Sequence, residues 1–178
     1  MNTFPNGERR EGKSRENMAR SVFYSFHYQN DISRVNVVRN HWVTQGTQTI
    51  TGVIDHADFE AVQRKGDKAV KDWIDGQLSG TTATVVLIGS ETLSRPYVQY
   101  EIQESYNRGN AVIGVHIHNI KDLSGNTAIS QSDYTMVNIN GKMTLFREVA
   151  DSIYDWVLND GYHNLGTWVE EAVLKHGR

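Results

Sequence analysis

The sequence predicts an α/β fold built on an open, doubly wound parallel sheet of about five strands. Two observations predict it. Short, continuous apolar runs rich in β-branched residues are typical of strands that are buried on both faces of a parallel sheet. Segments with helical apolar spacing alternate with these runs, and such alternation favours right-handed crossovers that place helices on both faces. An additional helix is predicted at the C-terminus.

The first half of the chain supplies two predicted strands and two predicted helices. Residues 21–26 form the first apolar run, and residues 53–55 are a shorter candidate strand. Between them, residues 31–43 repeat apolar side chains at helical spacing, with Asp31 in position to cap the helix. Residues 67–78 repeat apolar side chains in the same way and predict a second helix.

The centre of the chain has the most regular strand–helix–strand pattern. Residues 84–88 and 111–117 are continuous apolar runs, which predict two further strands. Ser94 and Pro96 lie between them and together make a good helix start. We expect that helix to end at Gly109, just before the next strand.

The C-terminal part supplies one more strand and two helices. Residues 134–139 are predicted to be the fifth strand. Residues 146–156 carry four large apolar side chains at helical spacing, which predicts an amphipathic helix. A similar pattern over residues 168–173 predicts the additional C-terminal helix.

Composition and charge exclude several classes of protein. The 178 residues include no cysteine, which excludes disulfides, thiolate metal sites and cysteine nucleophiles. No apolar run approaches the roughly 20 residues of a membrane-spanning helix. With 18 Lys and Arg against 21 Asp and Glu, the chain lacks the continuous basic surface of a general nucleic-acid binder. We therefore expect a cytoplasmic protein that binds neither membranes nor nucleic acid.

The first twenty residues differ in charge from the rest of the chain. Residues 1–20 carry a net charge of +2, whereas the remaining residues carry −5. This segment has neither a periodic apolar face nor the hydrophobic core of a secretory signal. We expect residues 1–20 to be a flexible N-terminal extension and residues 21–178 to be a single domain.

Common signatures of catalysis and nucleotide binding are missing. The chain has no Gly-x-Gly-x-x-Gly after the first strand, no P-loop and no Gly-x-Ser-x-Gly elbow. His116 and His118 project from one face of a predicted strand, at a spacing that could grip a metal ion. Because no third ligand has a suitable spacing, we favour a structural role for both and expect no metal site.

Candidate ligand-binding residues gather where the predicted strands end. Open parallel sheets bind ligands at the carboxyl ends of their strands. Phe26, His27 and Tyr28 lie at the end of the first strand. Asp55 ends the short second strand, and Ser90 follows the third. We therefore expect these five residues to surround a ligand.

One glutamate of the predicted third helix is a candidate for catalysis. Glu101 shares a helical face with Tyr97 and Ser105, beside the apolar stripe of that helix. The alternative interpretation is a solvated glutamate at the protein surface. From residue spacing alone, the surface glutamate is the favoured interpretation.

The order of these segments resembles that of a TIR domain. The match spans roughly residues 21–118, and agreement over several elements is more specific than a single motif. The third helix resembles the family's Ser-x-Trp-Cys-x-x-Glu-Leu segment, with Tyr97 for the tryptophan and Val98 for the cysteine. The other matching residues are Val22, Phe23, Ser25, Phe26 and Asp31, residues 53–55, Lys65 and Gly66 near the BB loop, and residues 85–90. The resemblance implies a flavodoxin-like sheet, with Glu101 as the catalytic glutamate.

Within that family, residues 26–28 and 34–43 look most like the TIR-like subunit of bacterial Thoeris anti-phage defence. The resemblance implies a hydrolase of the NAD glycohydrolase or ADP-ribosyl cyclase type, which makes a cyclic ADP-ribose isomer. That second messenger would activate a separate effector protein. The resemblance also implies NAD as the substrate without a cofactor, a phage-derived trigger and a homo-oligomer. The expected substrate-binding residues are Phe26, Tyr28 and Tyr97 as walls, His27 and Asp55 as polar contacts, and Ser90.

Two other functions remain open from the sequence. Many TIR domains are adaptors that assemble through surface helices and loops without turning over NAD, and the departures at Tyr97 and Val98 would suit such a module. A phosphorylation-type receiver shares the same sheet. It needs a phospho-acceptor aspartate after a central strand, whereas Ile88 is followed by Gly89 and Ser90.

Overall fold

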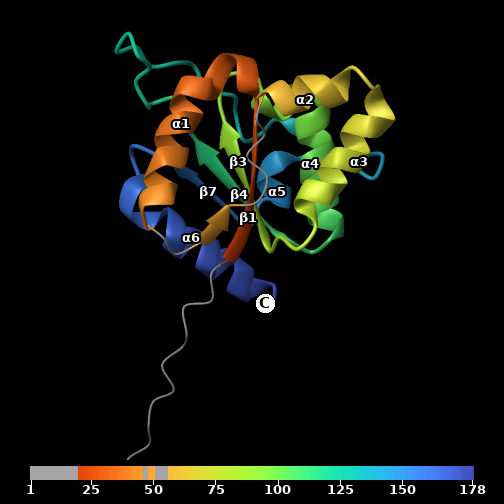
Figure 1. The fold of residues 1–178 in the computed structure, drawn as a ribbon. Helices are drawn as coiled ribbons and strands as arrows, with labels where there is room; N and C mark the ends of the chain where they lie inside the picture. The colour runs from red at the N-terminus through yellow and green to blue at the C-terminus, as the bar shows by residue number, and fades with distance from the viewer. Residues whose placement is uncertain (1–19, 46–47, 51–55) are drawn as a thin grey trace, which may run out of the picture.

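The computed structural model describes residues 20–45, 48–50 and 56–178, which are built around a parallel sheet (Figure 1). The strands of this sheet are β1 (Arg20–Phe26), β2 (Gln48–Ile50), β3 (Ala83–Ile88), β4 (Ala111–His116) and β7 (Ser152–Asp155). Within the described residues they pair in the order β2-β1-β3-β4-β7, all in parallel. This is the strand order of flavodoxin-like doubly wound sheets, so the predicted fold class is confirmed.

Helices cover both faces of the sheet (Figure 1). They are α1 (Tyr28–Gln45), α2 (His56–Gln63), α3 (Asp67–Leu78), α4 (Pro96–Asn107), α5 (Phe146–Val149) and α6 (Gly161–Lys175). α1 and α6 pack on one face, whereas α3, α4 and α5 pack on the other, with α2 beside α3. Strands β3 and β4 are buried along almost their whole length as a result. In the described part of the chain, no helix combines the length and apolar character needed to cross a membrane.

The carboxyl ends of β1 and β3 mark the point where the strand order reverses. β1 pairs with β2 on one side and with β3 on the other, where Phe26 is opposite Leu87. The chain leaves β1 into α1 on one face of the sheet. It leaves β3 through the short 3-10 helix η1 (Thr92–Ser94) into α4 on the opposite face. Doubly wound sheets bind their ligands at such a point.

The helix predicted over residues 146–156 is wrong. α5 ends at Val149, and β7 follows as a strand of the main sheet. The Asp151 backbone N–H donates to the Val112 carbonyl, and the Asp151 carboxylate accepts from the Val112 N–H, each at 2.8 Å. These two hydrogen bonds hold the chain alongside β4, so pairing in the sheet overrides the helical apolar spacing.

The strand predicted over residues 134–139 exists, but it does not belong to the main sheet. β5 (Met136–Ile139) pairs antiparallel with β6 (Lys142–Leu145) in a separate hairpin. The connecting Asn140 and Gly141 both have positive φ angles, 53° and 83°, as tight hairpin turns require. An Asn-Gly pair between short strands indicates a hairpin, and this signal could have been read from the sequence.

The remaining element predictions differ in outcome. The helices predicted over residues 67–78 and from Pro96 onward are confirmed as α3 and α4, and α6 confirms the C-terminal helix. α1 begins at Tyr28, so Asp31 lies in its first turn and is not its cap. α2 was not predicted. The candidate strand 53–55 and the predicted N-terminal extension, apart from Arg20, lie outside the described residues.

Candidate active site

A cavity of about 310 Å³ lies at the carboxyl end of β1. Its lining comes from the end of β1, the start of α1, α2 and the first half of α4. The predicted site residues that line it are Phe26, His27, Tyr28, Tyr97 and Glu101. The fold therefore brings together residues that are up to 75 positions apart in the chain.

Glu101 is buried, with only 2% of its surface exposed, although it lines this cavity. The Ser25 hydroxyl of β1 donates to Glu101 Oε2 at 2.5 Å. Burial raises the pKa of Glu101 from 4.5 to about 8, and the hydrogen bond from Ser25 opposes that rise. A solvated surface glutamate is therefore the wrong interpretation. A carboxyl group with a strongly shifted pKa in a cavity is a candidate catalytic group.

Helix α4 is fixed to the sheet around Glu101. Pro96 occupies the start of the helix, where its missing N–H costs no hydrogen bond. Ile102 is fully buried in the core beneath β3 and β4. One turn after Glu101, the Ser105 hydroxyl donates to the Glu101 carbonyl at 2.6 Å and lies 2.6 Å from Thr84 Oγ1 of β3. The carboxyl group is thus carried by a helix with little freedom to shift.

Aromatic rings form much of the cavity wall. The ring centroid of the buried Phe26 lies 6.4 Å from that of Tyr28. Tyr97 of α4 meets Phe59 of α2 edge to face, with 5.9 Å between the ring centroids. Aromatic faces pack well against flat rings and attract cationic ones. The cavity therefore suits a ligand that carries aromatic rings, including a positively charged one.

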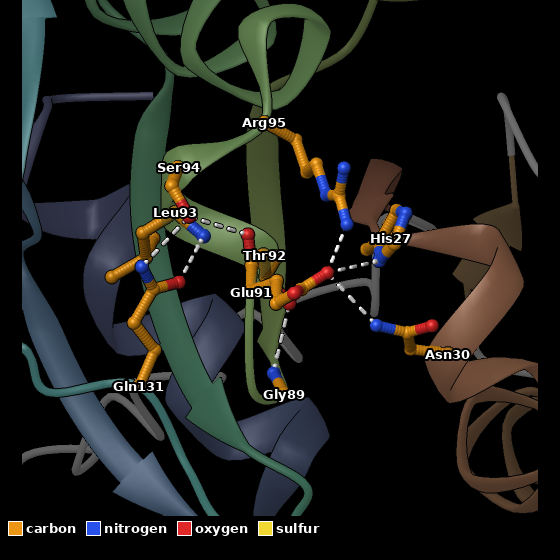
Figure 2. Close-up of polar contacts among 9 residues, drawn as sticks. All are labelled: His27, Asn30, Gly89, Glu91, Thr92, Leu93, Ser94, Arg95 and Gln131. Atoms are coloured by element: carbon orange, nitrogen blue, oxygen red, sulfur yellow. Dashed lines mark hydrogen bonds and ion pairs between the residues drawn. The ribbon is translucent and has the colours of Figure 1, made fainter.

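In the loop between β3 and α4, the carboxylate of Glu91 interacts with three side chains (Figure 2). Arg95 Nη2 and Asn30 Nδ2 both donate to Glu91 Oε2, the second at 3.0 Å. His27 Nδ1 lies 4.0 Å from the same oxygen. Burial lowers the pKa of His27, and the Arg95 charge lowers it further, against the opposing effect of Glu91. Glu91 thus connects this loop to the start of α1.

Gln131 braces the same loop from a distant part of the chain (Figure 2). Its backbone N–H donates to the Gly89 carbonyl at 2.8 Å. Its side-chain amide accepts from the Leu93 N–H at 2.7 Å and donates to Ser94 Oγ at 3.0 Å. The Gly89 N–H in turn donates to Thr92 Oγ1 at 2.8 Å. Both backbone groups of Gly89 are therefore held in place.

Gly89→Ala is expected to destabilise the protein by about 1–3 kcal/mol, as overpacking of a buried site does. A Cβ atom at Gly89 would overlap the carboxylate of Asp31, which is buried in the first turn of α1. The backbone of Gly89 cannot move away, because hydrogen bonds fix its N–H and its carbonyl. Denaturant-induced unfolding measures the difference.

Gly76→Ala is the matched control, because the described residues leave the space around a Cβ at Gly76 in α3 open. We expect that control to be neutral or stabilising. Adding Asp31→Ala to Gly89→Ala removes the overlapping group and should recover part of the lost stability. Strictly additive effects of the two substitutions would contradict the proposed clash.

The structure does not bring every predicted residue into the cavity, and it adds others. Ser90 is exposed and does not line the cavity, and Asp55 lies outside the described residues. Seven of the described lining residues were not predicted as site residues: Phe59, Glu60, Gln63, Arg95, Gln29, Pro96 and Val98. The first three belong to α2, whose helical pattern was not recognised. Arg95 could have been found from its place between Ser94 and Pro96 at the start of a predicted helix.

The two histidines of the β4 region make contacts with polar neighbours. His116 Nδ1 lies 2.6 Å from Ser130 Oγ, and His118 Nδ1 lies 3.7 Å from Asp155 Oδ2. Among residues 20–45, 48–50 and 56–178, no group of three His, Cys, Asp or Glu side chains could hold a metal ion.

Comparisons with known proteins give two similarities. Residues 23–122 match a family model described as Thoeris protein ThsB, TIR-like domain. The chain is also 37% identical over 191 residues to a Bacillus cereus protein named "Putative cyclic ADP-D-ribose synthase ThsB1". That match covers 85% of this chain and 100% of the relative. The segment matched by the family model includes Glu101 and all the other described residues that line the cavity.

Proposed function

Because the chain belongs to the Thoeris ThsB family of TIR-like domains, we propose that it is an enzyme that cleaves the nicotinamide–ribosyl bond of NAD and forms a cyclic ADP-ribose product. The relative's name describes the synthesis of cyclic ADP-D-ribose, and the match extends over its full length. This supports carrying the activity over to this chain.

One observation carries the proposal: a buried carboxyl group in an aromatic cavity at the carboxyl ends of the central strands. Glu101 supplies the carboxyl group, and the Ser25 hydroxyl fixes it at 2.5 Å. Both residues lie at the point of the sheet where doubly wound folds bind nucleotides. The cavity thus lies where such folds bind nucleotides, and it contains one group that can stabilise positive charge.

A single glutamate is chemically sufficient for this reaction. Most glycosidases need a second carboxyl group to protonate a poor oxygen leaving group. The nicotinamide of NAD is already a positively charged pyridinium, so it leaves as a neutral molecule without a proton. The ribose that remains has oxocarbenium character. An ionised Glu101 would stabilise this charge and accept hydrogen bonds from the ribose hydroxyls.

Cyclisation sets a further requirement on the cavity. A nucleophilic atom of the same molecule must reach the reactive ribose carbon before water does. A folded NAD molecule raises the effective concentration of that internal nucleophile, and an apolar wall excludes water. Phe26, Tyr28, Phe59 and Tyr97 give this cavity such a wall.

The proposed product links this protein to a partner through a small molecule. We propose that the cyclic nucleotide acts as a second messenger in the cytoplasm and activates a separate effector protein. We further propose that a phage-derived signal starts the reaction and that the protein works as a homo-oligomer. A protein that waits for such a signal would show little activity at rest, because the inactive state would dominate its population.

The test is to incubate the purified protein with NAD and follow free nicotinamide and cyclic ADP-ribose species by chromatography and mass spectrometry. Small molecules are also extracted from infected cells that carry either the wild-type protein or Glu101→Gln. We expect a cyclic product that depends on Glu101 in at least one of these two settings. If neither setting yields nicotinamide or a Glu101-dependent product, an adaptor function replaces the proposed enzyme.

Phe26→Ala is expected to shift the products from cyclic towards linear ADP-ribose. Phe26 forms part of the wall at the end of β1, and a smaller side chain admits water beside the reactive carbon. Chromatography gives the ratio of the two products. Because truncation of a buried aromatic residue costs about 3–5 kcal/mol of stability, Phe26→Leu serves as a milder variant. An unchanged product ratio in both folded variants would contradict a role in excluding water.

A further inference from the structure

On the basis of the proposed function, we infer that Arg95 binds the diphosphate of the dinucleotide substrate, and that Glu91 holds the same guanidinium while the cavity is empty. Arg95 is the residue directly before α4, at the edge of the cavity that contains Glu101. Nothing in the chemistry of the glycosidic bond itself requires this arginine. Its role would be to recognise the charged middle part of the substrate.

The charges around the cavity single out Arg95. Among the described residues that line it, Arg95 carries the only permanent positive charge, whereas Glu60 and Glu101 are acids. A dinucleotide brings two negative phosphate groups close to these acids. Without a cation to pair with them, the phosphates would be repelled and poorly solvated. Arg95 is the lining group that can supply the missing charge.

The guanidinium of Arg95 is only partly satisfied by its present partner. Its Nη2 donates to Glu91 Oε2, but its Nε is buried and has no hydrogen-bond partner among the residues that the structure describes. Arginine binds phosphate through two parallel N–H groups, and the pair formed by Nε and one Nη suits this geometry. A donor shielded from water without an acceptor is unfavourable, so an incoming phosphate oxygen would relieve this cost.

The start of α4 adds to the attraction for an anion. Within the described part of the chain, no side chain caps the N-terminus of this helix, and its twelve residues place a partial positive charge at that end. Arg95 occupies the cap position itself. The guanidinium and the helix end therefore favour negative charge at the same place.

Glu91 can release Arg95 without losing all its partners. Its carboxylate also accepts a hydrogen bond from Asn30 at 3.0 Å and lies 4.0 Å from His27 (Figure 2). The side chain of Glu91 is 49% exposed, and exposed ion pairs contribute little net stability. A diphosphate with two negative charges can thus displace a single carboxylate from the guanidinium.

The competing explanation is that Arg95 and Glu91 form a purely structural ion pair. Separate substitutions of the two residues distinguish this explanation from the proposed phosphate site. If the pair only holds the loop, substitution of either residue should weaken substrate binding in the same direction. If Glu91 occupies the phosphate site, the two substitutions should have opposite effects. Removal of Arg95 should weaken binding of NAD, whereas removal of the Glu91 charge should strengthen it.

The experiment measures binding by isothermal titration calorimetry in full-length protein that carries Glu101→Gln, so that NAD stays intact. The variants are Arg95→Gln and Glu91→Gln, with Arg147→Gln as the matched control, because Arg147 lies over the ring of Tyr134 and does not line the cavity. The probes are NAD and nicotinamide riboside, which lacks phosphate. Circular dichroism checks that each variant is folded.

We expect Arg95→Gln to weaken NAD binding by roughly 10- to 100-fold, as loss of a charged hydrogen bond does, and to leave nicotinamide riboside binding unchanged. Glu91→Gln should tighten NAD binding, and the Arg147 control should not alter it. Equal weakening by both substitutions, or unchanged NAD binding in Arg95→Gln, would overturn the inference. If the parent Glu101→Gln protein binds no NAD at all, the proposed function itself fails. That result differs from the two results that would overturn the role of Arg95 alone.

Discussion

Glu101→Gln is expected to reduce NAD cleavage by about 10²- to 10³-fold, the usual cost of removing one electrostatic group from a transition state. Gln keeps the shape of the side chain and can still accept the hydrogen bond from Ser25. It cannot carry the negative charge that stabilises the oxocarbenium-like ribose. Release of nicotinamide from NAD, measured as initial rates, gives the comparison.

The matched control is Glu104→Gln, the same chemical change three residues further along α4 and outside the cavity lining. We expect near wild-type turnover in this control. The unfolding free energy of both variants shows whether the fold is intact. A folded Glu101→Gln protein that still turns over NAD at the wild-type rate would exclude Glu101 as the catalytic carboxylate.

Stability should move in the opposite direction to activity in Glu101→Gln. Burial raises the pKa of Glu101 from 4.5 to about 8, so between these values the folded protein keeps a proton that the unfolded chain releases. The stability due to this protonation is complete below pH 4.5 and is lost as the pH rises through about 8. Gln has no such dependence. The variant should therefore exceed the wild type in stability by several kcal/mol at alkaline pH.

The kcat/KM for NAD is expected to rise about tenfold for each pH unit below a break near pH 8, and to level off above it. Only the ionised carboxylate stabilises the cationic ribose, and burial keeps Glu101 mostly protonated at lower pH. The positive nicotinamide of bound NAD favours the ionised form. The break in kcat should therefore lie at a lower pH than the break in kcat/KM.

His27 provides the control for this pH profile. It also lines the cavity, but burial lowers the pKa of its imidazole from 6.5, so it cannot cause a break near pH 8. His27→Asn should retain the break, although its absolute rates can change. A flat profile between about pH 6 and pH 9 would contradict the assignment of the rate-determining charge to Glu101.

The sequence predicts the buried centre of this fold better than its edges. Helices cover both faces of β1, β3 and β4, so these strands consist largely of apolar residues. Such runs can be recognised directly in the sequence. Residues 146–156 show the limit of such patterns. Their apolar spacing fits a helix, yet two hydrogen bonds between Asp151 and Val112 decide in favour of a strand.

The candidate site depends even more on contacts that leave no pattern in the sequence. The candidate role of Glu101 came from the family resemblance, but its burial and its bond to Ser25 depend on how α4 meets β1. Arg95 stands where the family's segment has a serine, so the motif does not predict an arginine there, and its place beside Glu91 appears only once the loop is folded. Spacing along the chain cannot predict contacts between side chains from three elements.

The hydrogen bonds of Gln131 determine how long a segment must be if the site is to be transferred intact from this chain to a related protein. The family-matched segment ends at residue 122, but the loop that carries Glu91 and leads to Arg95 is braced by Gln131, nine residues beyond it. A chimera that received only the matched segment would inherit the lining residues without this brace. The transferable unit of the proposed NAD site is therefore longer than the segment by which the family is recognised.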